Sequence, residues 1–424
     1  MNLILFEDAA VDSLGAITLG RPAYAITCGS FRLVDLLRPM AETVVGVVRP
    51  HLQALQASDE PTFAQELDTA SPLTLLVNAR AVPSVRNWRQ LQQMIEQAES
   101  AGEGLSTVIA GDNQSFAAAA VPTSLIVRDY GGVSAELIEK LIEACASRSS
   151  GEESPIDLFE FGHDVVRCNM ACIAENLQHR IESGNYDQVA DGLYVADGQQ
   201  PPANVAIDTS GGPVVIESNV TLGPFSYLKG PVYLGHNVKV SEHAALKDEV
   251  CISHTCKVGG EVEATVFEPY SNKQHYGFLG HAYVGSWVNL GAGTCNSDLK
   301  NTYGKVNMVY DGKKTPTQMQ FMGCIIGDYA KTAIQTSIFT GKQIGVGSMV
   351  YGWTAENVPS FVNYAQTFGS TSLMSPEVLI TTQQRMFGRR SVEQRPCDIQ
   401  LVHDMFRLTA KERPADLKDE PPQL

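Results

Sequence analysis

The sequence predicts an α/β domain, then a parallel β-helix, then a C-terminal helical extension, in a chain of 424 residues. Two observations carry this prediction. Short apolar runs alternate with amphipathic helical stretches over residues 1–160, and apolar residues recur every six positions farther along the chain. Neither a helix, with a period of about 3.6 residues, nor a strand, with a period of about 2, gives a six-residue repeat. Three hexads make one triangular coil of a parallel β-helix, and the coils stack.

The α/β domain is expected over residues 1–160. Its strands are short apolar runs, namely Leu3–Phe6, Thr43–Val48, Leu73–Val77 and Thr107–Ala110. Asn87 can cap one amphipathic helix, and a second helix starts near Ser134. Alternating strands and helices favour a mostly parallel sheet with helices on its faces. Ligands of such sheets bind at the carboxyl ends of the strands, where this chain places Glu7, Asp8, Asn78, Arg80, Gly111 and Asp112.

Residues 161–204 are expected as a helical arm and a linker. Six apolar residues share one helical face: Val165, Val166, Met170, Ile173, Leu177 and Ile181. Gly184 ends this helix. The stretch Asp187–Asn204 is polar and contains Pro201 and Pro202, so it is interpreted as the linker.

The β-helix is expected over residues 205–358. Its repeating apolar residues are Ile216, Leu222, Leu228, Leu234, Val240, Leu246, Ile252 and Val258, and the phase resumes at Phe278, Val284 and Leu290 and again at Ile326, Ile338, Ile344 and Val350. Two stretches, Thr265–Gly277 and about Asn296–Cys324, break the hexads and are expected to project as loops, the usual place for chemistry. Residues 359–424 contain two amphipathic stretches, Pro376–Arg389 and Val392–Ala410, which would cap the open end.

Composition excludes several classes of function. The net charge of −16 argues against a nucleic-acid-binding protein. No apolar stretch approaches the ~18 residues of a membrane span, and the N-terminus is interpreted as a first strand rather than a signal peptide. The nine cysteines show no pairing rhythm, which favours free thiols in a cytoplasmic protein. His163, Cys168 and Cys172 lie close together, but a zinc site needs a fourth ligand, so no metal is expected there.

The first hexad break carries a motif, Ser271-Asn272-Lys273-Gln274-His275-Tyr276-Gly277-Phe278-Leu279-Gly280, and Gly285-Ser286-Trp287-Val288-Asn289-Leu290-Gly291-Ala292-Gly293-Thr294 follows it. These segments resemble the acetyltransferase half of the GlmU-type bifunctional family, which acetylates glucosamine-1-phosphate and then makes UDP-N-acetylglucosamine. The resemblance covers residues 205–352 well and the first domain only faintly. It implies a left-handed β-helix, a homotrimer and an amino-sugar (phosphate) N-acetyltransferase that uses acetyl-CoA.

On this match His275 takes the place of the family's general base. An amine that attacks a thioester must lose a proton as the tetrahedral intermediate forms, and imidazole titrates near the working pH. The alternative is a structural histidine whose nitrogens are satisfied by hydrogen bonds. His281 lies close by but outside the matched positions, so a structural role is expected for it.

Seven further positions are expected to contact the acceptor: Lys257, Glu261, Asn272, Lys273, Phe278, Asn289 and Asn296. Asn289 corresponds to a sugar-contacting asparagine, whose amide can donate and accept; the alternative is an asparagine ladder on a coil corner. Phe278 replaces a tyrosine, so a hydroxyl contact is lost. The family's phosphate-clamping arginine and lysine fall on Ala245 and Glu263, so Lys257 and Lys273 are the candidates for the positive charge.

Acetyl-CoA is expected along the wall of the β-helix at Gly291, Ala292, Gly293 and Thr294, where small residues allow close approach to the backbone. Lys331 and Lys342 are candidate partners for its phosphates. The alternative for both lysines is simple exposure to water.

The first domain departs from the sugar nucleotidyltransferases that it resembles. Those enzymes carry a Gly-rich loop after the first strand, whose backbone N–H groups cradle a triphosphate. Here no glycine follows Phe6 until Gly15. Arg21, Asn78 and Arg80 are the candidate nucleotide-binding residues, with UTP or another NTP as ligand and Mg²⁺ as a candidate cofactor. A domain that has kept the fold and lost the reaction is an equal alternative.

Two other functions stay open. The chain could be a sugar nucleotidyltransferase only, with the β-helix as its trimerisation module. It could also be a non-catalytic protein that binds sugar nucleotides without turnover.

Overall fold

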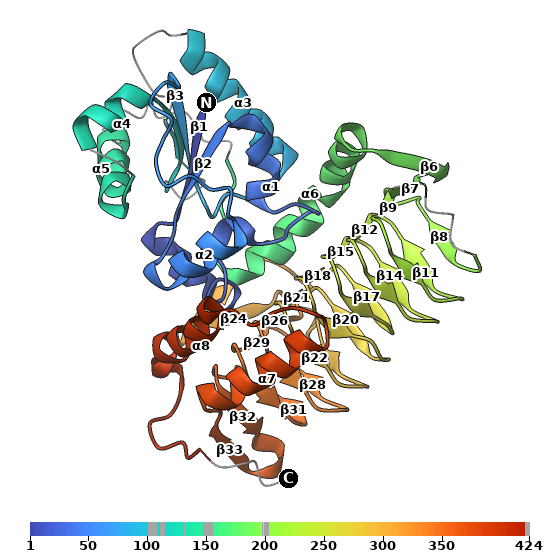
Figure 1. Cartoon of the computed structure of the whole chain (residues 1–424). Helices are drawn as coiled ribbons and strands as arrows, with labels where there is room; N and C mark the ends of the chain where they lie inside the picture. Colours follow the sequence, from blue (N-terminus) through green and yellow to red (C-terminus); the bar gives the residue numbers. More distant parts are fainter. Residues whose placement is uncertain are drawn as a thin grey trace. The chain divides into compact units, whose positions relative to one another are not determined.

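The computed structural model describes residues 1–100, 108–110, 115–130, 133–146, 156–196, 198 and 203–419. These residues form two compact units (Figure 1). The first contains residues 1–14, 21–26 and 31–160, and the second contains residues 15–20, 27–30 and 161–424. The predicted order of an α/β domain, a β-solenoid and C-terminal helices is confirmed.

The first unit is built on a five-stranded sheet in the order β2-β1-β3-β5-β4. Its strands are β1 (Asn2–Phe6), β2 (Thr43–Val47), β3 (Leu73–Asn78), β4 (Val108–Ala110) and β5 (Phe116–Pro122). β1 pairs in parallel with β2 and β3, whereas β5 is antiparallel to β3 and β4. The sheet is therefore mostly parallel, as predicted. β5 was not expected, because its run of alanines has little strand propensity and is buried by its position between two strands.

The helices of this unit are α1 (Leu33–Leu37), α2 (Gln53–Asp59), α3 (Val85–Ser100), α4 (Thr123–Tyr130) and α5 (Ala135–Ala146), with short 3₁₀ turns between them. The expected capping role of Asn87 is wrong, because Asn87 lies inside α3. Ser84 is the capping side chain, and its Oγ accepts the backbone N–H of Asn87 at 3.1 Å. The Asn87 amide instead donates to the carbonyl oxygens of Val82 and Asp157, at 2.9 and 3.0 Å.

The second unit is a three-sided parallel solenoid. One side, the β9 face, contains β6 (Tyr186–Ala190), β7 (Leu193–Ala196), β9 (Val214–Ile216), β12 (Val232–Leu234), β15 (Val250–Ile252), β18 (Val266–Phe267), β21 (Tyr283–Val284), β26 (Cys324–Ile326) and β29 (Lys342–Ile344). The β10 face contains β10 (Thr221–Leu222), β13 (Lys239–Val240), β16 (Lys257–Val258), β19 (Asn272–Lys273), β22 (Asn289–Leu290), β27 (Lys331–Thr332), β30 (Met349–Val350), β32 (Val362–Ala365) and β33 (Ser370–Leu373).

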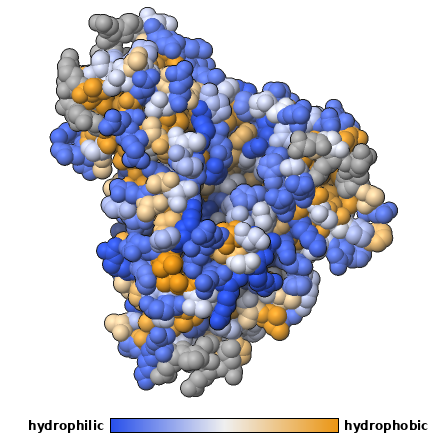
Figure 2. Space-filling view, viewed as in Figure 1, coloured by the Kyte–Doolittle hydropathy of each residue, from blue (hydrophilic) through white to orange (hydrophobic). Residues whose placement is uncertain are grey.

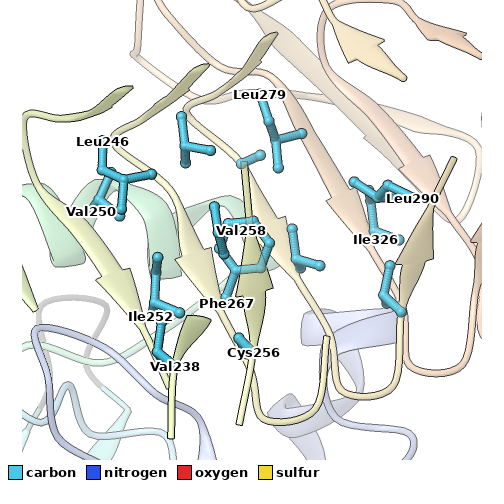
Figure 3. Close-up of a cluster of buried hydrophobic side chains, with 14 of the residues drawn as sticks. Val238, Leu246, Val250, Ile252, Cys256, Val258, Phe267, Leu279, Leu290 and Ile326 are labelled. Atoms are coloured by element: carbon cyan, nitrogen blue, oxygen red, sulfur yellow. The ribbon is translucent and has the colours of Figure 1, made fainter. Parts of the chain in front are cut away.

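The third side, the β11 face, contains β8 (Ala206–Asp208), β11 (Tyr227–Lys229), β14 (Ala245–Lys247), β17 (Glu261–Glu263) and β20 (Phe278–Gly280), and β23 (Cys295–Asn296), β28 (Ser337–Ile338) and β31 (Trp353–Thr354) continue it. Most hexad residues point into the interior of the coils, where Figure 3 shows Leu246, Ile252 and Val258 among them. Each fully buried side chain of this kind contributes about 1.5–3 kcal/mol.

The two breaks in the hexad repeat have different structures. Lys239 pairs with Lys257, eighteen positions on, but Lys257 pairs with Asn272, only fifteen positions on. The first break is therefore a shortened coil and not a projecting loop. After it the interior residue is Leu279, which is 0% exposed, so the expected inward position of Phe278 is wrong by one residue. The second break is a true insertion and contains the hairpin of β24 (Asn307–Tyr310) and β25 (Lys313–Pro316).

The stretch expected as an arm and linker is part of the solenoid unit. Helix α6 (Gly162–Ser183) contacts the solenoid through Asn169, whose amide donates to the carbonyl oxygen of Glu249 at 2.7 Å. Part of Asp187–Asn204 forms strands instead of a linker, because β6 and β7 make a hairpin and β7 pairs with β9. Among the described helices, none is both long enough and apolar enough to cross a membrane.

The C-terminal segment folds back on the solenoid through α7 (Pro376–Gly388) and α8 (Pro396–Leu408). These helices were expected to cap the open end, but strand β33 closes the β10 face there by pairing with β32. α7 lies along the flank of the coils (Figure 1), since Leu379 approaches Gly347 and the Phe387 ring packs at a tilt on Trp287. The outward surface over α7 is hydrophilic (Figure 2).

Candidate active site

His275 lies in an exposed turn between β19 and β20, at the corner where the chain passes from the β10 face to the β11 face. Lys273 holds this turn from inside. Its ammonium group donates to the carbonyl oxygens of Gly259 and His275, both at 2.9 Å. Only 2% of Lys273 is exposed, and this burial lowers the pKa of its side chain to about 8. The Lys273 side chain therefore braces the backbone of the turn.

The next two coils supply further support for the same turn. The backbone N–H of Gly293 donates to the carbonyl oxygen of Tyr276 at 3.0 Å, and the Gln335 amide donates to the Tyr276 hydroxyl. A Cβ atom on Gly293 would lie 2.7 Å from the Gln335 side chain, and one on Gly291 would lie 2.6 Å from the carbonyl oxygen of Ala333. Close stacking against backbone thus requires glycine at Gly291, whereas the φ of +76° is what favours glycine at Gly293, since the Gln335 side chain can move aside.

The β10 face brings several expected residues into one column. Lys257, Asn272, Asn289 and Lys331 are in register on neighbouring strands. The Asn272 amide lies 3.5 Å from Oδ1 of Asn289, which is the asparagine ladder considered above. Both asparagines have polar atoms at the surface. Asn272 lies three residues before His275, and Asn289 lies one coil farther along, in register with Asn272.

The β11 face, on the other side of His275, carries paired charges. Lys247 forms ion pairs with Glu261 at 2.7 Å and with Glu263 at 3.4 Å. Phe278 is in register with Glu261 and faces outward. Asn296 is turned inward instead, because its amide exchanges two 2.8 Å hydrogen bonds with the backbone of Gly280. Asn296 is 4% exposed, so the structure does not bring it to the same surface.

Only some of the residues expected to hold acetyl-CoA lie at the His275 corner. Gly291 and Ala292 are half-buried on the His275 corner, whereas Thr294 is buried and bonds Thr332 at 2.7 Å. Lys331 lies under α7, with Nζ 2.9 Å from Sδ of Met386, and burial lowers its pKa to about 8. Lys342 lies on the β9 face, so the two lysines do not share a surface.

In the first unit the expected crevice residues bind one another. The Arg80 guanidinium, 0% exposed, donates to both oxygens of Asp8 at 2.9 and 2.8 Å and to the carbonyl oxygen of Phe159 at 2.8 Å. The Asn78 amide donates to Asp8 at 2.8 Å, and Glu7 pairs with Arg49 at 3.0 Å. Arg21 is also buried. Gly111 and Asp112 lie outside the described residues.

These residues do not fit a Mg²⁺ site. Mg²⁺ is bound through carboxylate oxygens that keep room for water, but the Asp8 and Glu7 oxygens are already neutralised by arginines. Within the described ranges, no group of three His, Cys, Asp or Glu side chains could hold a metal ion.

His281 faces a different corner from His275. Its Nδ1 lies 2.9 Å from Asp298, and its ring stacks on Phe321 with centroids 5.3 Å apart. A cavity of about 420 Å³ adjoins it and is lined by Arg167, Met170, Ala171, Glu249, His281, Met319, Gln320 and Phe321. None of the site residues expected from the sequence lines this cavity.

Two arginines near the site were not expected from the sequence. Arg390, which follows α7, donates to Oδ1 of Asn272 at 2.6 Å, and Arg389 precedes it. The only signal was the pair of basic residues after Gly388. Their approach to a strand 118 positions earlier depends on tertiary packing, which no local pattern reveals.

Comparisons with known proteins agree with this architecture. A model of the family "Sugar nucleotidyl transferase" matches residues 3–183. A bifunctional sugar-1-phosphate nucleotidylyltransferase/acetyltransferase from Sulfurisphaera tokodaii is 29% identical over 91 residues, 22% of this chain and 23% of that protein. The bifunctional protein GlmU from Thermotoga maritima is 30% identical over 149 residues, 35% of this chain and 26% of that protein. The chain thus spans about a quarter of the length of these curated relatives.

Two solved structures show a weak likeness. A UDP-N-acetylglucosamine acyltransferase from Francisella novicida has 12% identity and a TM-score of 0.25, over 53% of this chain and 94% of that chain. The acetyltransferase domain of PglB from Neisseria gonorrhoeae has 10% identity and a TM-score of 0.17, over 84% and 93%. Such low TM-scores support no inference about activity. The chain is thus similar over part of its length to GlmU-type bifunctional transferases, and its residues 3–183 match the sugar nucleotidyl transferase family.

Proposed function

We propose that this chain transfers an acetyl group from acetyl-CoA to the amine of an amino sugar or amino-sugar phosphate, with His275 as the general base. The observation that carries the proposal is an exposed imidazole on a turn that Lys273 and Gly293 hold in place. A rigid support of this kind keeps a general base in the position that proton transfer needs.

The chemistry follows from the groups around the corner. The amine nitrogen attacks the thioester carbonyl carbon, His275 takes the proton that the amine loses, and the carbon–sulfur bond breaks to release CoA. The Asn272 and Asn289 amides can bond sugar hydroxyls on the β10 face. Glu261 and Phe278 border the same corner on the β11 face. Gly291 and Ala292 offer half-buried backbone beside the turn for acetyl-CoA.

Release of free CoA thiol by the purified protein tests this function. Acetyl-CoA is offered with a panel of amino sugars and their phosphates. Steady thiol release with one acceptor supports the proposal. A protein that binds sugar nucleotides but releases no thiol with any acceptor is the non-catalytic alternative.

Nucleotidyl transfer by the first unit is a second candidate function, favoured by the match of residues 3–183. We expect this activity to be weak, because Arg80 and Asn78 are held by Asp8 and no Gly-rich loop follows β1. Pyrophosphate release from UTP and N-acetylglucosamine-1-phosphate with Mg²⁺ measures it. A rate near ~10 s⁻¹, ordinary for an enzyme, would show that the domain is fully active.

A homotrimer is the assembly that we propose. Three large apolar residues are more than half exposed along the corner that carries His275, namely Phe225, Tyr276 and Ile334, and Trp353 at the start of β31 is a fourth on the adjoining β11 face. Exposed apolar residues along one edge can form part of an interface. Sedimentation at micromolar concentration should give three times the chain mass. An active monomer would contradict a site shared between subunits.

A further inference from the structure

The β10 face carries a pair of lysines next to the His275 turn. Lys239 and Lys257 stand directly opposite each other on β13 and β16, while their neighbours Val240 and Val258 point into the core. Like charges in register on adjacent strands repel and destabilise a sheet. The next residue in this column is Asn272, three positions before His275.

The segment after α7 adds two arginines to the same place. The Phe387 ring packs on Trp287 at a tilt of 32° with centroids 4.4 Å apart, and Trp287 stacks on Tyr270 at 4.2 Å. These ring contacts fix the end of α7 against the coils. As a result Arg390 reaches Asn272 at 2.6 Å, with Arg389 beside it.

These four residues, Lys239, Lys257, Arg389 and Arg390, form what we name the basic cluster. Burial, together with the charges of Arg390, Lys239 and Arg389, lowers the pKa of Lys257. In the part of the chain that the structure describes, no carboxylate forms an ion pair with any of the four. The chain has a net charge of −16, yet none of its described carboxylates neutralises these four cations. The cluster therefore attracts an anion that is not part of the chain.

The β11 face, on the other side of the His275 corner, carries negative charge instead. Lys247 on the β11 face is outnumbered by Glu261 and Glu263, with which it pairs. A phosphate would therefore be repelled from the β11 face and attracted to the β10 face.

We infer that the basic cluster binds the phosphate of a phosphorylated acceptor, clamping it between the β10 face and the segment after α7. The inference rests on the proposed acetyl transfer only in assigning the phosphate to the acceptor. Asn272 precedes His275 by three residues, so the two lie at most about 11 Å apart along the chain. The long lysine and arginine side chains of the cluster can hold a phosphate within that distance of an amine at His275.

The test uses the double variant Arg389→Gln/Arg390→Gln and, separately, Lys239→Gln, which leaves the contacts of α7 untouched. Inorganic phosphate is the first probe, titrated calorimetrically against the full chain. We expect either variant to raise the Kd about 10-fold or more, the scale of lost hydrogen bonds to a charged group. Arg385→Gln, an exposed arginine on α7 itself, is the matched control and should change nothing.

Kinetics then identify the source of the phosphate. The KM for an amino-sugar phosphate should rise in both variants, while the KM values for the unphosphorylated amino sugar and for acetyl-CoA stay constant. A rise for acetyl-CoA that disappears with its 3′-dephospho form would overturn the assignment to the acceptor, and unchanged phosphate binding would overturn the site. If the wild type binds phosphate through the cluster but releases no CoA, the proposed function fails and the site stands.

Discussion

Replacing His275 by alanine should lower the rate of acetyl transfer by about 10² or more, the usual loss when a general base is removed. The fold should not change, because His275 is exposed and the described residues make no hydrogen bond to its imidazole. The hydrogen bond from Lys273 ends on the backbone oxygen of His275, which alanine keeps. We expect kcat to fall while the KM for acetyl-CoA changes little, as measured by thiol release.

His243→Ala is the matched control for this variant. His243 occupies the same corner two coils earlier and stacks on Phe225 with centroids 5.4 Å apart. It shares the exposure and the coil position of His275 but not the support from Lys273. The control should keep full activity. A well-folded His275→Ala protein that turns over at nearly the normal rate would remove His275 from the mechanism.

The sequence predicted the solenoid well because its periodicity is a direct record of burial. Ile252 and Val258 repeat at six positions since each lies inside a coil, and no other regular fold has that period. The failure at Phe278 has the same cause. A coil shortened by three residues shifts the phase, and the sequence alone offers both Phe278 and Leu279 for the interior position.

The placement of the candidate residues could be predicted only where it is local. Asn272 and His275 belong to one short motif, and Asn289 on the next coil is in register with Asn272 on the β10 face, beside the His275 turn. The inward turn of Asn296 and the burial of Lys331 under α7 depend on which element packs over each strand. The same limit hid the approach of Arg390 to Asn272, since a residue pattern does not show where a helix docks.

The buried pair of Asp8 and Arg80 in the first unit gives the largest expected effect on stability. The Arg80 side chain is 0% exposed in its ion pair with Asp8, which is 18% exposed. Asp8→Asn would leave the guanidinium buried without its counter-charge. Breaking a buried ion pair on one side costs about 3–5 kcal/mol, so we expect the free energy of unfolding of this unit to fall by that amount. If Asp8 served only to bind a ligand, its replacement by asparagine would leave the free energy of unfolding unchanged.

Urea unfolding, followed by the fluorescence of Trp88, measures the loss. The other two tryptophans, Trp287 and Trp353, belong to the second unit, so a background in which both are phenylalanine makes Trp88 the reporter of the first unit. Asp12→Asn is the control. Asp12 is 81% exposed, and its carboxylate makes only a distant ion pair with Arg49, at 3.9 Å. An exposed pair of this kind contributes about 0–1 kcal/mol. Equal unfolding midpoints for the two variants, with nucleotide binding lost only in Asp8→Asn, would instead make Asp8 and Arg80 part of a ligand site. The double variant Asp8→Leu/Arg80→Met should recover most of the lost stability, because it removes both buried charges together.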